Sequence, residues 1–220
     1  MARCATQKRA PLTRDRVLRA ALELADEGGT AALTMERIGR GLGVEAMSLY
    51  RHVRNKDDIL DGIVDLVFAE IERPVDRSSW RTVLRAQSIS TRAVLRRHPW
   101  AITLMESRVT PGPANLRIHE DTITVLLDTG CSAAMATHAY NLIDSYVYGF
   151  ALQEANFPFR NAEELAAMSE QLLANQQADT YPNSARVARE LLASGFDYGN
   201  EFEFGLDLIL DALAPLLRAG

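Results

Sequence analysis

The chain has 220 residues, 47% of them hydrophobic and 24% charged, a composition that supports a folded core and excludes an intrinsically disordered chain. No apolar run approaches the roughly 18 residues that span a bilayer, and the basic N-terminus lacks the apolar segment of a secretory signal. Two cysteines, Cys4 and Cys131, make neither a disulfide framework nor a metal cluster, so we expect a cytoplasmic protein. The net charge of −5 argues against a nucleic-acid partner for the chain as a whole.

The charge is unevenly distributed along the chain. Residues 1–56 hold 11 Lys and Arg against 6 Asp and Glu, whereas the rest of the chain holds 13 against 23. A basic beginning on an acidic remainder keeps nucleic acid open as a partner of the first part. The basic side chains at the start can contact DNA phosphates or the minor groove, or can form a solubilising tail, and the residues alone do not separate the two readings. They are Arg3, Lys8, Arg9, Arg14 and Arg16.

Apolar residues recur at helical spacing almost throughout, which predicts an all-α fold. A first helix begins after Thr13, whose side chain can cap its N-terminus, and ends at the pair Gly28-Gly29. Thr34 caps a short second helix, and Gly43 ends it, because glycine tolerates the positive φ of a tight turn.

A third short helix is expected from about Glu45 to His52, and a longer fourth one from the N-cap Asn55 to Pro74. The polar segment 73–79 then separates two parts of the chain. Seven further helices are expected at about 80–97, 99–107, 113–129, 132–156, 161–176, 184–194 and 200–218.

Three short helices with a glycine turn between the last two are typical of a helix-turn-helix. Leu49 can face inward toward Ile38 and Leu42, which leaves the small side chains at the start of the third helix free to enter a major groove. A small helical bundle with a charged face is the alternative interpretation of the same pattern.

The segment "TMERIGRGLGVEAMSLYRHVRNKDDIL" (34–60) resembles the DNA-binding head of the tetracycline-repressor (TetR) family of one-component bacterial regulators. The likeness extends along the chain, because "SSW" (78–80), "VYGFALQE" (147–154) and "FEFGLDLILDALAPLL" (202–217) are similar to segments of the subfamily nearest the tetracycline repressor. The resemblance implies a flexible arm (1–12), a helix-turn-helix domain (13–57), a connecting helix (58–73) and a ligand-binding and dimerisation domain (74–220).

The resemblance also implies roles for residues of the head. Thr34, Tyr50, His52 and Lys56 would anchor DNA phosphates. Met35, Glu36, Glu45, Ala46, Met47 and Ser48 would lie nearest the base edges, and Arg37 and Arg51 complete the predicted surface. Two positions depart from the family pattern: Gly39 replaces a usual alanine, which should loosen the second helix by about 1 kcal/mol, and Glu36 lies where a basic residue is common.

A short reader helix gains specificity from a two-fold dimer, so the second part of the chain must supply an interface. Gly149 and Gly205 lie within apolar helices, where each costs about 1 kcal/mol unless a close approach compensates. Close packing inside one protomer is the alternative explanation. The predicted interface comprises Gly149, Gly205, Leu206, Ile209 and Leu213.

The family resemblance further implies a small-molecule effector. Polar side chains in apolar company are its expected lining: Gln87, Thr91, Trp100, Met105, Thr122, Tyr140, Asn141, Asp144, Tyr148 and Gln153. The tetracycline repressor chelates a metal-bound drug through a His and a Glu, and Met105 and Gln153 align with those positions. Because neither is a good Mg²⁺ ligand, we expect an apolar or aromatic effector, no metal and no cofactor.

The sequence holds no Gly-rich phosphate loop, nucleophile elbow or metalloprotease motif, so we expect no enzyme. The prediction is a repressor that binds a palindromic operator as a homodimer and is released by a small molecule. The alternatives are a helical small-molecule carrier without DNA function, which the basic head disfavours, and a regulator controlled by a protein partner.

Overall fold

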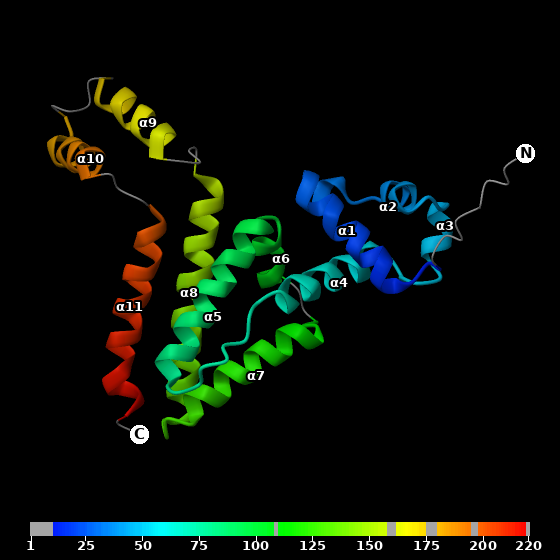
Figure 1. Ribbon diagram of the computed structural model, residues 1–220, viewed down its shortest axis with the longest axis horizontal. Coiled ribbons are helices and arrows are strands. Elements are labelled where there is room, and N and C mark those ends of the chain that lie inside the picture. Colours follow the sequence, from blue (N-terminus) through cyan, green and yellow to red (C-terminus); the bar gives the residue numbers. More distant parts are fainter. Residues whose placement is uncertain (1–10, 108–109, 158–161, 175–179, 195–197, 219–220) are drawn as a thin grey trace, which may run out of the picture. The chain divides into compact units, whose positions relative to one another are not determined.

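The computed structural model describes residues 11–107, 110–157, 162–174, 180–194 and 198–218, and every element in these ranges is helical (Figure 1), which confirms the all-α prediction. The first elements are α1 (Arg14–Gly28), the 3-10 turn η1 (Thr30–Ala32), α2 (Met35–Leu42), α3 (Ala46–Leu49) and α4 (Lys56–Ala69). They are followed by α5 (Trp80–Arg97), α6 (Ala101–Ser107), α7 (Pro113–Leu127), α8 (Ala133–Asn156), α9 (Ala162–Ala174), α10 (Pro182–Ser194) and α11 (Tyr198–Leu217). No helix of the described chain is both long enough and apolar enough to span a bilayer.

The chain forms two compact units that alternate along the sequence. The first unit comprises Met1–Val75 and Ser90–Thr124, and the second comprises Asp76–Ile89 and Val125–Gly220. Helices α5 and α7 each contribute residues to both units. The segment after the predicted boundary at residue 74 is therefore shared between the units rather than assigned to one of them.

In the first unit, α1, α2 and α4 begin directly after the residues that were predicted to cap them. Thr13 Oγ1 accepts from the Arg16 N–H at 3.3 Å, and Thr34 Oγ1 accepts from the Arg37 N–H at 3.2 Å. Asn55 Oδ1 accepts from the Asp58 N–H at 2.8 Å. Each side chain satisfies an amide that the first helical turn leaves without a partner, which is worth about 1 kcal/mol.

Two of the predicted helices are shorter than expected. Helix α3 ends at Leu49 instead of His52, because the His52 N–H bonds the Leu49 carbonyl at 2.8 Å in a tight turn and Val53 then enters the core. Helix α4 ends at Ala69 instead of Pro74, since the Ile71 N–H already bonds the Phe68 carbonyl in a tight turn. Backbone hydrogen bonds of the i to i−3 type close both ends.

One apolar cluster holds the first unit together. Its buried members are Val17, Leu18, Ala21, Ala25, Leu33, Ile38, Leu49, Val53, Ile59, Leu60 and Ile63, contributed by α1 to α4 and their connections. Trp100, just before α6, and Leu104, on α6, pack against the same cluster. The helix-turn-helix therefore shares its core with the start of α6.

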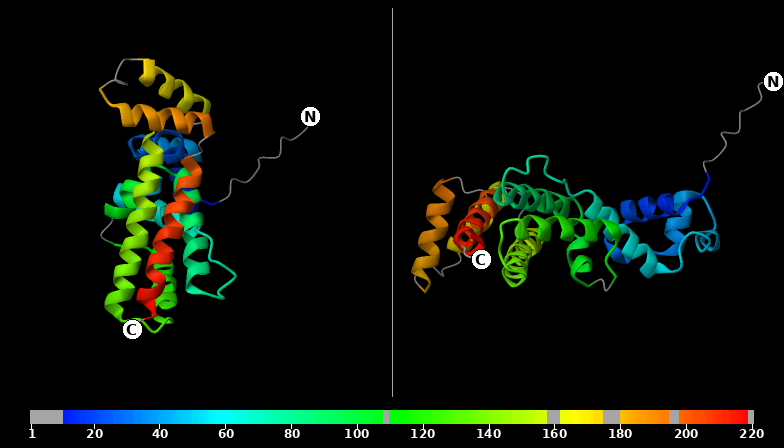
Figure 2. Two further views of the ribbon diagram at one scale, coloured as in Figure 1. Left: turned by 90° about the vertical axis from the view of Figure 1, so that its left-hand side faces the viewer. Right: turned by 90° about the horizontal axis from the view of Figure 1, so that it is seen from below.

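The second unit is built on α8 and α11, which lie side by side (Figures 1 and 2). Their buried faces include Ile143, Val147 and Phe150 on α8, and Phe202, Leu206, Leu210, Leu213 and Leu217 on α11. The Tyr146 ring stacks on Phe202 with centroids 5.6 Å apart. Helices α9 and α10 lie at the end of this pair where α8 finishes and α11 begins (Figure 1).

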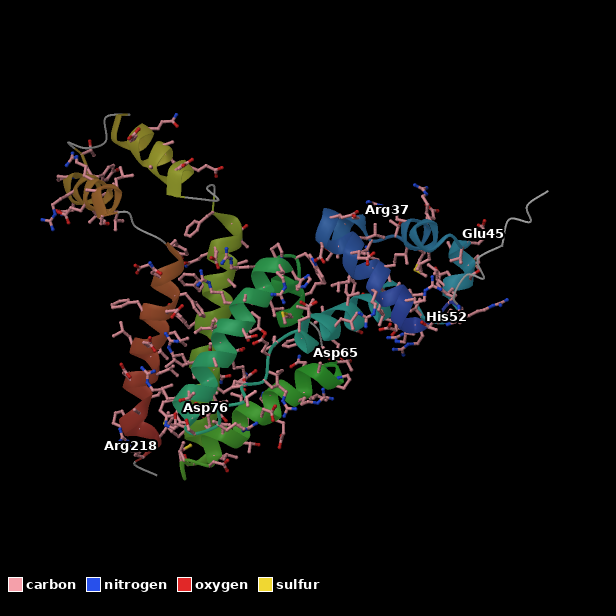
Figure 3. All side chains as sticks on the ribbon, viewed as in Figure 1. Arg37, Glu45, His52, Asp65, Asp76 and Arg218 are labelled. Carbon is pink, nitrogen blue, oxygen red and sulfur yellow. The ribbon has the colours of Figure 1, made fainter. Side chains whose placement is uncertain are left out.

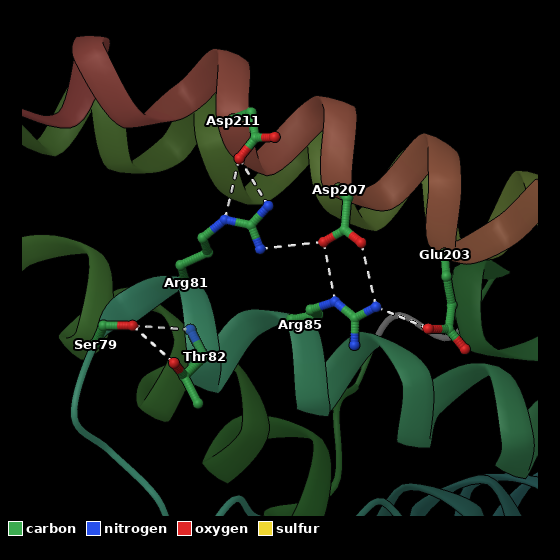
Figure 4. A network of polar contacts seen from close by, with 7 residues as sticks. All are labelled: Ser79, Arg81, Thr82, Arg85, Glu203, Asp207 and Asp211. Carbon is green, nitrogen blue, oxygen red and sulfur yellow. Dashed lines mark hydrogen bonds and ion pairs between the residues drawn. The ribbon is translucent and has the colours of Figure 1, made fainter.

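A ladder of ion pairs joins α5 to α11 (Figure 4). Arg81 contacts Asp207 at 3.1 Å and Asp211 at 2.7 Å, and Arg85 contacts Asp207 at 2.9 Å and Glu203 at 2.7 Å. The Arg85 hydrogen bond is the main cause of a lowered pKa of Asp207. Because the charges repeat every four residues on both helices, the ladder fixes the register of α5 against α11.

Candidate DNA-binding surface and effector site

The short helix α3 presents its first residues outward. Leu49 is fully buried in the core of the first unit, as predicted, whereas Met47 is 76% exposed and Tyr50 is 48% exposed. Figure 3 shows Glu45 and His52 at either end of α3. Ala46 and Ser48 are half-buried, so the outer side of α3 carries two small side chains and the uncharged Met47, which suits entry into a major groove.

Two helix N-termini lie on either side of α3 in the sequence. Helix α2 begins after Thr34, and α4 begins at Lys56, and both of these side chains are exposed. Met35 is half-buried, and Glu36, Arg37 and Arg51 are exposed. Amides at a helix N-terminus favour phosphate, so both starts are suited to the DNA backbone.

Gly39 has a packing role that sequence reasoning missed. A Cβ at this position would lie 2.8 Å from the Val44 carbonyl oxygen and 3.2 Å from the Ala46 nitrogen. Helix α2 therefore approaches the backbone of the turn directly, and Gly43 closes that turn with φ 67°. Glycine lowers the intrinsic helix propensity of α2, as expected, but the absence of a methyl group at this position is also what permits α2 to pack closely on the turn.

Arg14 and Asp58 tie the start of α1 to the start of α4. The guanidinium donates to both carboxylate oxygens of Asp58, at 2.9 and 2.8 Å, and the Arg54 N–H adds a bond of 2.8 Å. The Arg14 hydrogen bond, against the opposing effect of burial, lowers the pKa of Asp58 to about 2. Arg14, considered above for DNA contact, thus serves an internal pair.

The other basic residues of the N-terminal arm divide into two groups. Arg16 donates to the Pro11 carbonyl at 2.9 Å. Arg3, Lys8 and Arg9 lie outside the described residues.

The predicted interface residues do not all face outward. Leu206 is fully buried and Leu213 is 3% exposed, both in the core of the second unit, so the expectation that they reach a partner is wrong. A Cβ on Gly205 would overlap the Tyr146 hydroxyl, so this glycine serves a close approach of α11 to α8 within one protomer. Ile209 is half-buried, while Gly149 is exposed, with nothing within 4 Å of an added Cβ.

The predicted effector residues fall into both units. Thr91, Met105 and Thr122 are buried, and Trp100 is half-buried in the first unit, where its Nε1 donates to Asp26 at 2.7 Å. In the second unit Tyr140, Asp144 and Tyr148 recur every four residues along one half-buried side of α8, and Gln87 is half-buried on α5.

Two predicted effector residues face away from a protomer interior. Asn141 is exposed, and Gln153 is exposed and accepts from the Tyr198 hydroxyl at 3.1 Å. Helix α8 keeps both side chains on its exposed side, and the Gln153 amide finds its partner in Tyr198 of α11. Neither is placed to line a pocket inside the protomer.

Sequence reasoning missed two buried polar residues of α5. Ser88 is 5% and Arg92 9% exposed, and each directly follows a predicted effector residue of the same helix, Gln87 or Thr91. An arginine in an amphipathic helix normally suggests a solvated face, and no periodicity distinguishes this one from the exposed Arg96 and Arg97. Together these residues make α5 the helix with the most buried polar side chains among the described elements.

The comparisons with known proteins agree along the chain. The model described as "Bacterial regulatory proteins, tetR family" matches residues 17–63, and "Tetracyclin repressor-like, C-terminal domain" matches residues 73–217. The chain belongs to the tetracycline-repressor family. Family members are transcriptional regulators, which confirms both the predicted class and the expectation that this chain is not an enzyme.

Relatives and solved structures support the same placement over nearly the whole length. The transcriptional repressor DrrR1 of Streptomyces coeruleorubidus is 35% identical over 94% of this chain and 78% of its own. The tetracycline repressor class C of Escherichia coli is 29% identical over 93% and 92%. ActR of Streptomyces coelicolor, solved in complex with actinorhodin, is 28% identical with a TM-score of 0.77, covering 96% of this chain and 100% of ActR.

Proposed function

We propose that this regulator of the tetracycline-repressor family is a repressor that binds a palindromic operator as a homodimer and leaves it when a small molecule binds. The observation that carries the DNA-binding role is the outer side of α3, with exposed Met47 between half-buried Ala46 and Ser48, and with exposed helix starts at Thr34 and Lys56 on either side of it in the sequence. A protein of this function works at the nucleoid, in the cytoplasm.

The proposed contacts divide by chemistry. Thr34, Tyr50, His52 and Lys56 bind phosphates and set the position of α3, while side chains at the start of α2 and α3 face base edges. The exposed thioether of Met47 suits the methyl group of thymine, and the Glu36 carboxylate suits the N4 amino group of cytosine. The full proposed set is Thr34, Met35, Glu36, Arg37, Glu45, Ala46, Met47, Ser48, Tyr50, Arg51, His52 and Lys56.

Lys56→Ala should weaken binding to every DNA sequence and reduce the slope of log affinity against log salt by about one. The reason is the loss of one cation from the phosphate contact; Lys56 is exposed, and its ammonium makes a long bond of 3.4 Å to the Thr30 carbonyl. Fluorescence anisotropy with a selected operator and a scrambled duplex, at several salt concentrations, measures both effects.

The control for this experiment is Arg186→Ala, which removes an equal charge from the exposed surface of α10, where Arg186 pairs with Glu190 at 3.3 Å. It should leave affinity and slope unchanged. An unchanged slope in the Lys56 variant would show that this helix start does not touch the backbone, and the assignment of the head would be withdrawn.

The dimer is proposed to form through the outer sides of α8 and α11. These packed helices expose apolar side chains, with Phe204 64%, Leu208 55% and Leu216 53% exposed on α11, and Leu142 47% and Leu152 44% on α8. Exposed side chains this large, recurring at helical spacing on two adjacent helices, are typical of an interface. Gly149, on the outer side of α8, fits a close crossing with a second copy.

The effector is proposed to be apolar or aromatic and to contact α5 and the half-buried side of α8. Support comes from the tyrosines of α8, Tyr140 and Tyr148, on either side of Asp144, and from the half-buried Gln87 of α5, all within the second unit. The related ActR structures hold actinorhodin and (S)-DNPA, so this fold accommodates small molecules. A ligand releases DNA only through its differential affinity for two states of the dimer.

Tetracycline with Mg²⁺ should not stabilise this protein, because Met105 offers a thioether, and Gln153 an amide already bonded to Tyr198, where Mg²⁺ requires hard oxygen ligands. Thermal shift with the drug and metal, using the class C tetracycline repressor as a positive control, should show no rise in Tm. A rise of several degrees would overturn this exclusion. A library of aromatic compounds, screened in parallel for operator release, tests the proposed class.

A further inference from the structure

A buried histidine of the first unit joins three segments of its fold. His98, in the turn between α5 and α6, has a side chain only 7% exposed. Its Nδ1 lies 2.6 Å from Asp26 Oδ1 on α1, and its Nε2 lies 3.2 Å from Glu70 Oε2 at the C-cap of α4. The DNA-binding role uses neither His98 nor its two partners.

The geometry of these contacts determines the protonation state that satisfies them. An ionised carboxylate only accepts hydrogen bonds, and a neutral imidazole carries one N–H. Donation to both Asp26 and Glu70 therefore requires the imidazolium. In the neutral form, one ring nitrogen directs its lone pair at a carboxylate oxygen, so one of the two bonds is replaced by repulsion.

The groups around the ring keep the two carboxylates in place. The Trp100 indole N–H donates to the same Asp26 oxygen at 2.7 Å, and Arg97 donates to the same Glu70 oxygen at 2.7 Å. Burial raises the pKa of Glu70, but the hydrogen bonds from Arg97 and His98 together lower it by more, so the pKa lies below its usual value. The charged groups facing the ring are thus Asp26 from α1 and Glu70 from α4, with Arg97 of α5 beside Glu70.

The helices that meet at His98 are those that position α3. Helix α1 supplies much of the core against which Leu49 packs, and α4 carries Lys56 at its other end. Trp100 and Leu104 pack on the same core from the side of α6. A change at His98 therefore acts on the attachment of the helix-turn-helix to the α5–α6 turn.

We propose that His98 is a protonation-dependent positioning residue: its imidazolium fixes α1 and α4 against the α5–α6 turn, and loss of the proton loosens this attachment and weakens operator binding. The direction follows from preorganisation, because a head held in one orientation loses less freedom when it binds. Imidazole is the side chain that most often changes charge near neutral pH, so operator binding is expected to depend on pH. The DNA readout of this inference rests on the proposed function.

The test compares pH profiles of wild type, His98→Gln and Asp26→Asn in the full-length protein. From pH 6 to pH 8 the operator affinity of wild type should fall about tenfold more than that of His98→Gln, which cannot gain or lose a proton. Asp26→Asn keeps an oxygen that can accept from Trp100 and from the His98 Nδ1–H but removes the anionic charge that favours the imidazolium, so this variant should also respond less to pH. His119→Gln and His138→Gln, at exposed sites, should retain the wild-type profile.

A second readout does not depend on DNA. The Tm of wild type should fall by about 2–4 °C more than that of His98→Gln over the same pH range. If the Tm and the operator affinity of wild type, His98→Gln and Asp26→Asn all change in parallel with pH, the proposal is overturned. If wild type binds DNA at no pH but the Tm difference is present, the proposed function is rejected, and the role of His98 in holding α1 and α4 against the α5–α6 turn is retained.

Discussion

Asp58→Ala is expected to lower the free energy of unfolding of the first unit by about 2–3 kcal/mol at pH 7. The carboxylate is 6% exposed and accepts three short bonds, two from Arg14 and one from the Arg54 N–H. Its removal leaves the start of α4 without its link to α1, and leaves a backbone donor without an acceptor. Urea denaturation followed by tryptophan fluorescence reports this, because Trp100 packs on the core of the same unit.

The pH dependence of the same carboxylate provides an independent measurement. Its pKa is lowered from 3.8 to about 2 in the folded chain, so the native state binds fewer protons than the unfolded state between these values. The stabilisation is therefore complete above about pH 4 and is lost as the pH falls toward about 2, amounting to about 2 kcal/mol. In Asp58→Ala this part of the acid sensitivity should disappear.

Asp57→Asn is the matched control, because Asp57 is exposed and neighbours Asp58 in the first turn of α4. It removes an equal charge from the same helix N-terminus and should lower stability by less than about 1 kcal/mol. Equal losses in both variants would mean that the Arg14 pair contributes nothing beyond the favourable charge at the helix start.

The helix ends of the first unit could be predicted from the sequence because they depend on contacts between neighbouring residues. Thr13, Thr34 and Asn55 are N-caps because their side-chain oxygens reach an amide two or three residues on, and Gly43 takes the left-handed conformation that few other residues adopt. These effects act within one turn of helix. Contacts between distant segments, such as that of Asp26 with His98, carry no periodic signal, because the two residues lie 72 positions apart.

In the second unit the helices could be predicted from the sequence, but which residues of each helix are buried was harder to predict. Helix α11 has apolar residues on most of its circumference, so Leu206 and Leu213, which are buried, could not be distinguished by pattern from Phe204 and Leu208, which are exposed. The same ambiguity led to Asn141 and Gln153 being assigned to an interior. At Gly205 there is a close approach, but the neighbour belongs to the same chain, whereas an added Cβ at Gly149 meets nothing within 4 Å in the protomer.

Substitution of Gly149 and of Gly205 by leucine should therefore give two different defects. In Gly205→Leu the new side chain overlaps Tyr146, whose hydroxyl donates to the Glu201 and Phe202 carbonyls at 3.1 and 3.0 Å. Overpacking of this kind costs about 1–3 kcal/mol, more than the roughly 1 kcal/mol gained in helix propensity. We expect a lower Tm and weakened pairing of α8 with α11, with loss of assembly as a consequence.

In Gly149→Leu the protomer should fold at least as stably as wild type, because an added Cβ meets nothing within 4 Å and leucine favours the helix by about 1 kcal/mol. If the outer side of α8 is the dimer interface, the bulkier side chain prevents the close crossing of two copies. Operator affinity should then fall about 100-fold or more, because each half-site is bound alone. Sedimentation velocity and circular dichroism on both variants separate the cases: a folded monomer for Gly149→Leu supports the interface, and a normal dimer with wild-type affinity places the two-fold contact elsewhere.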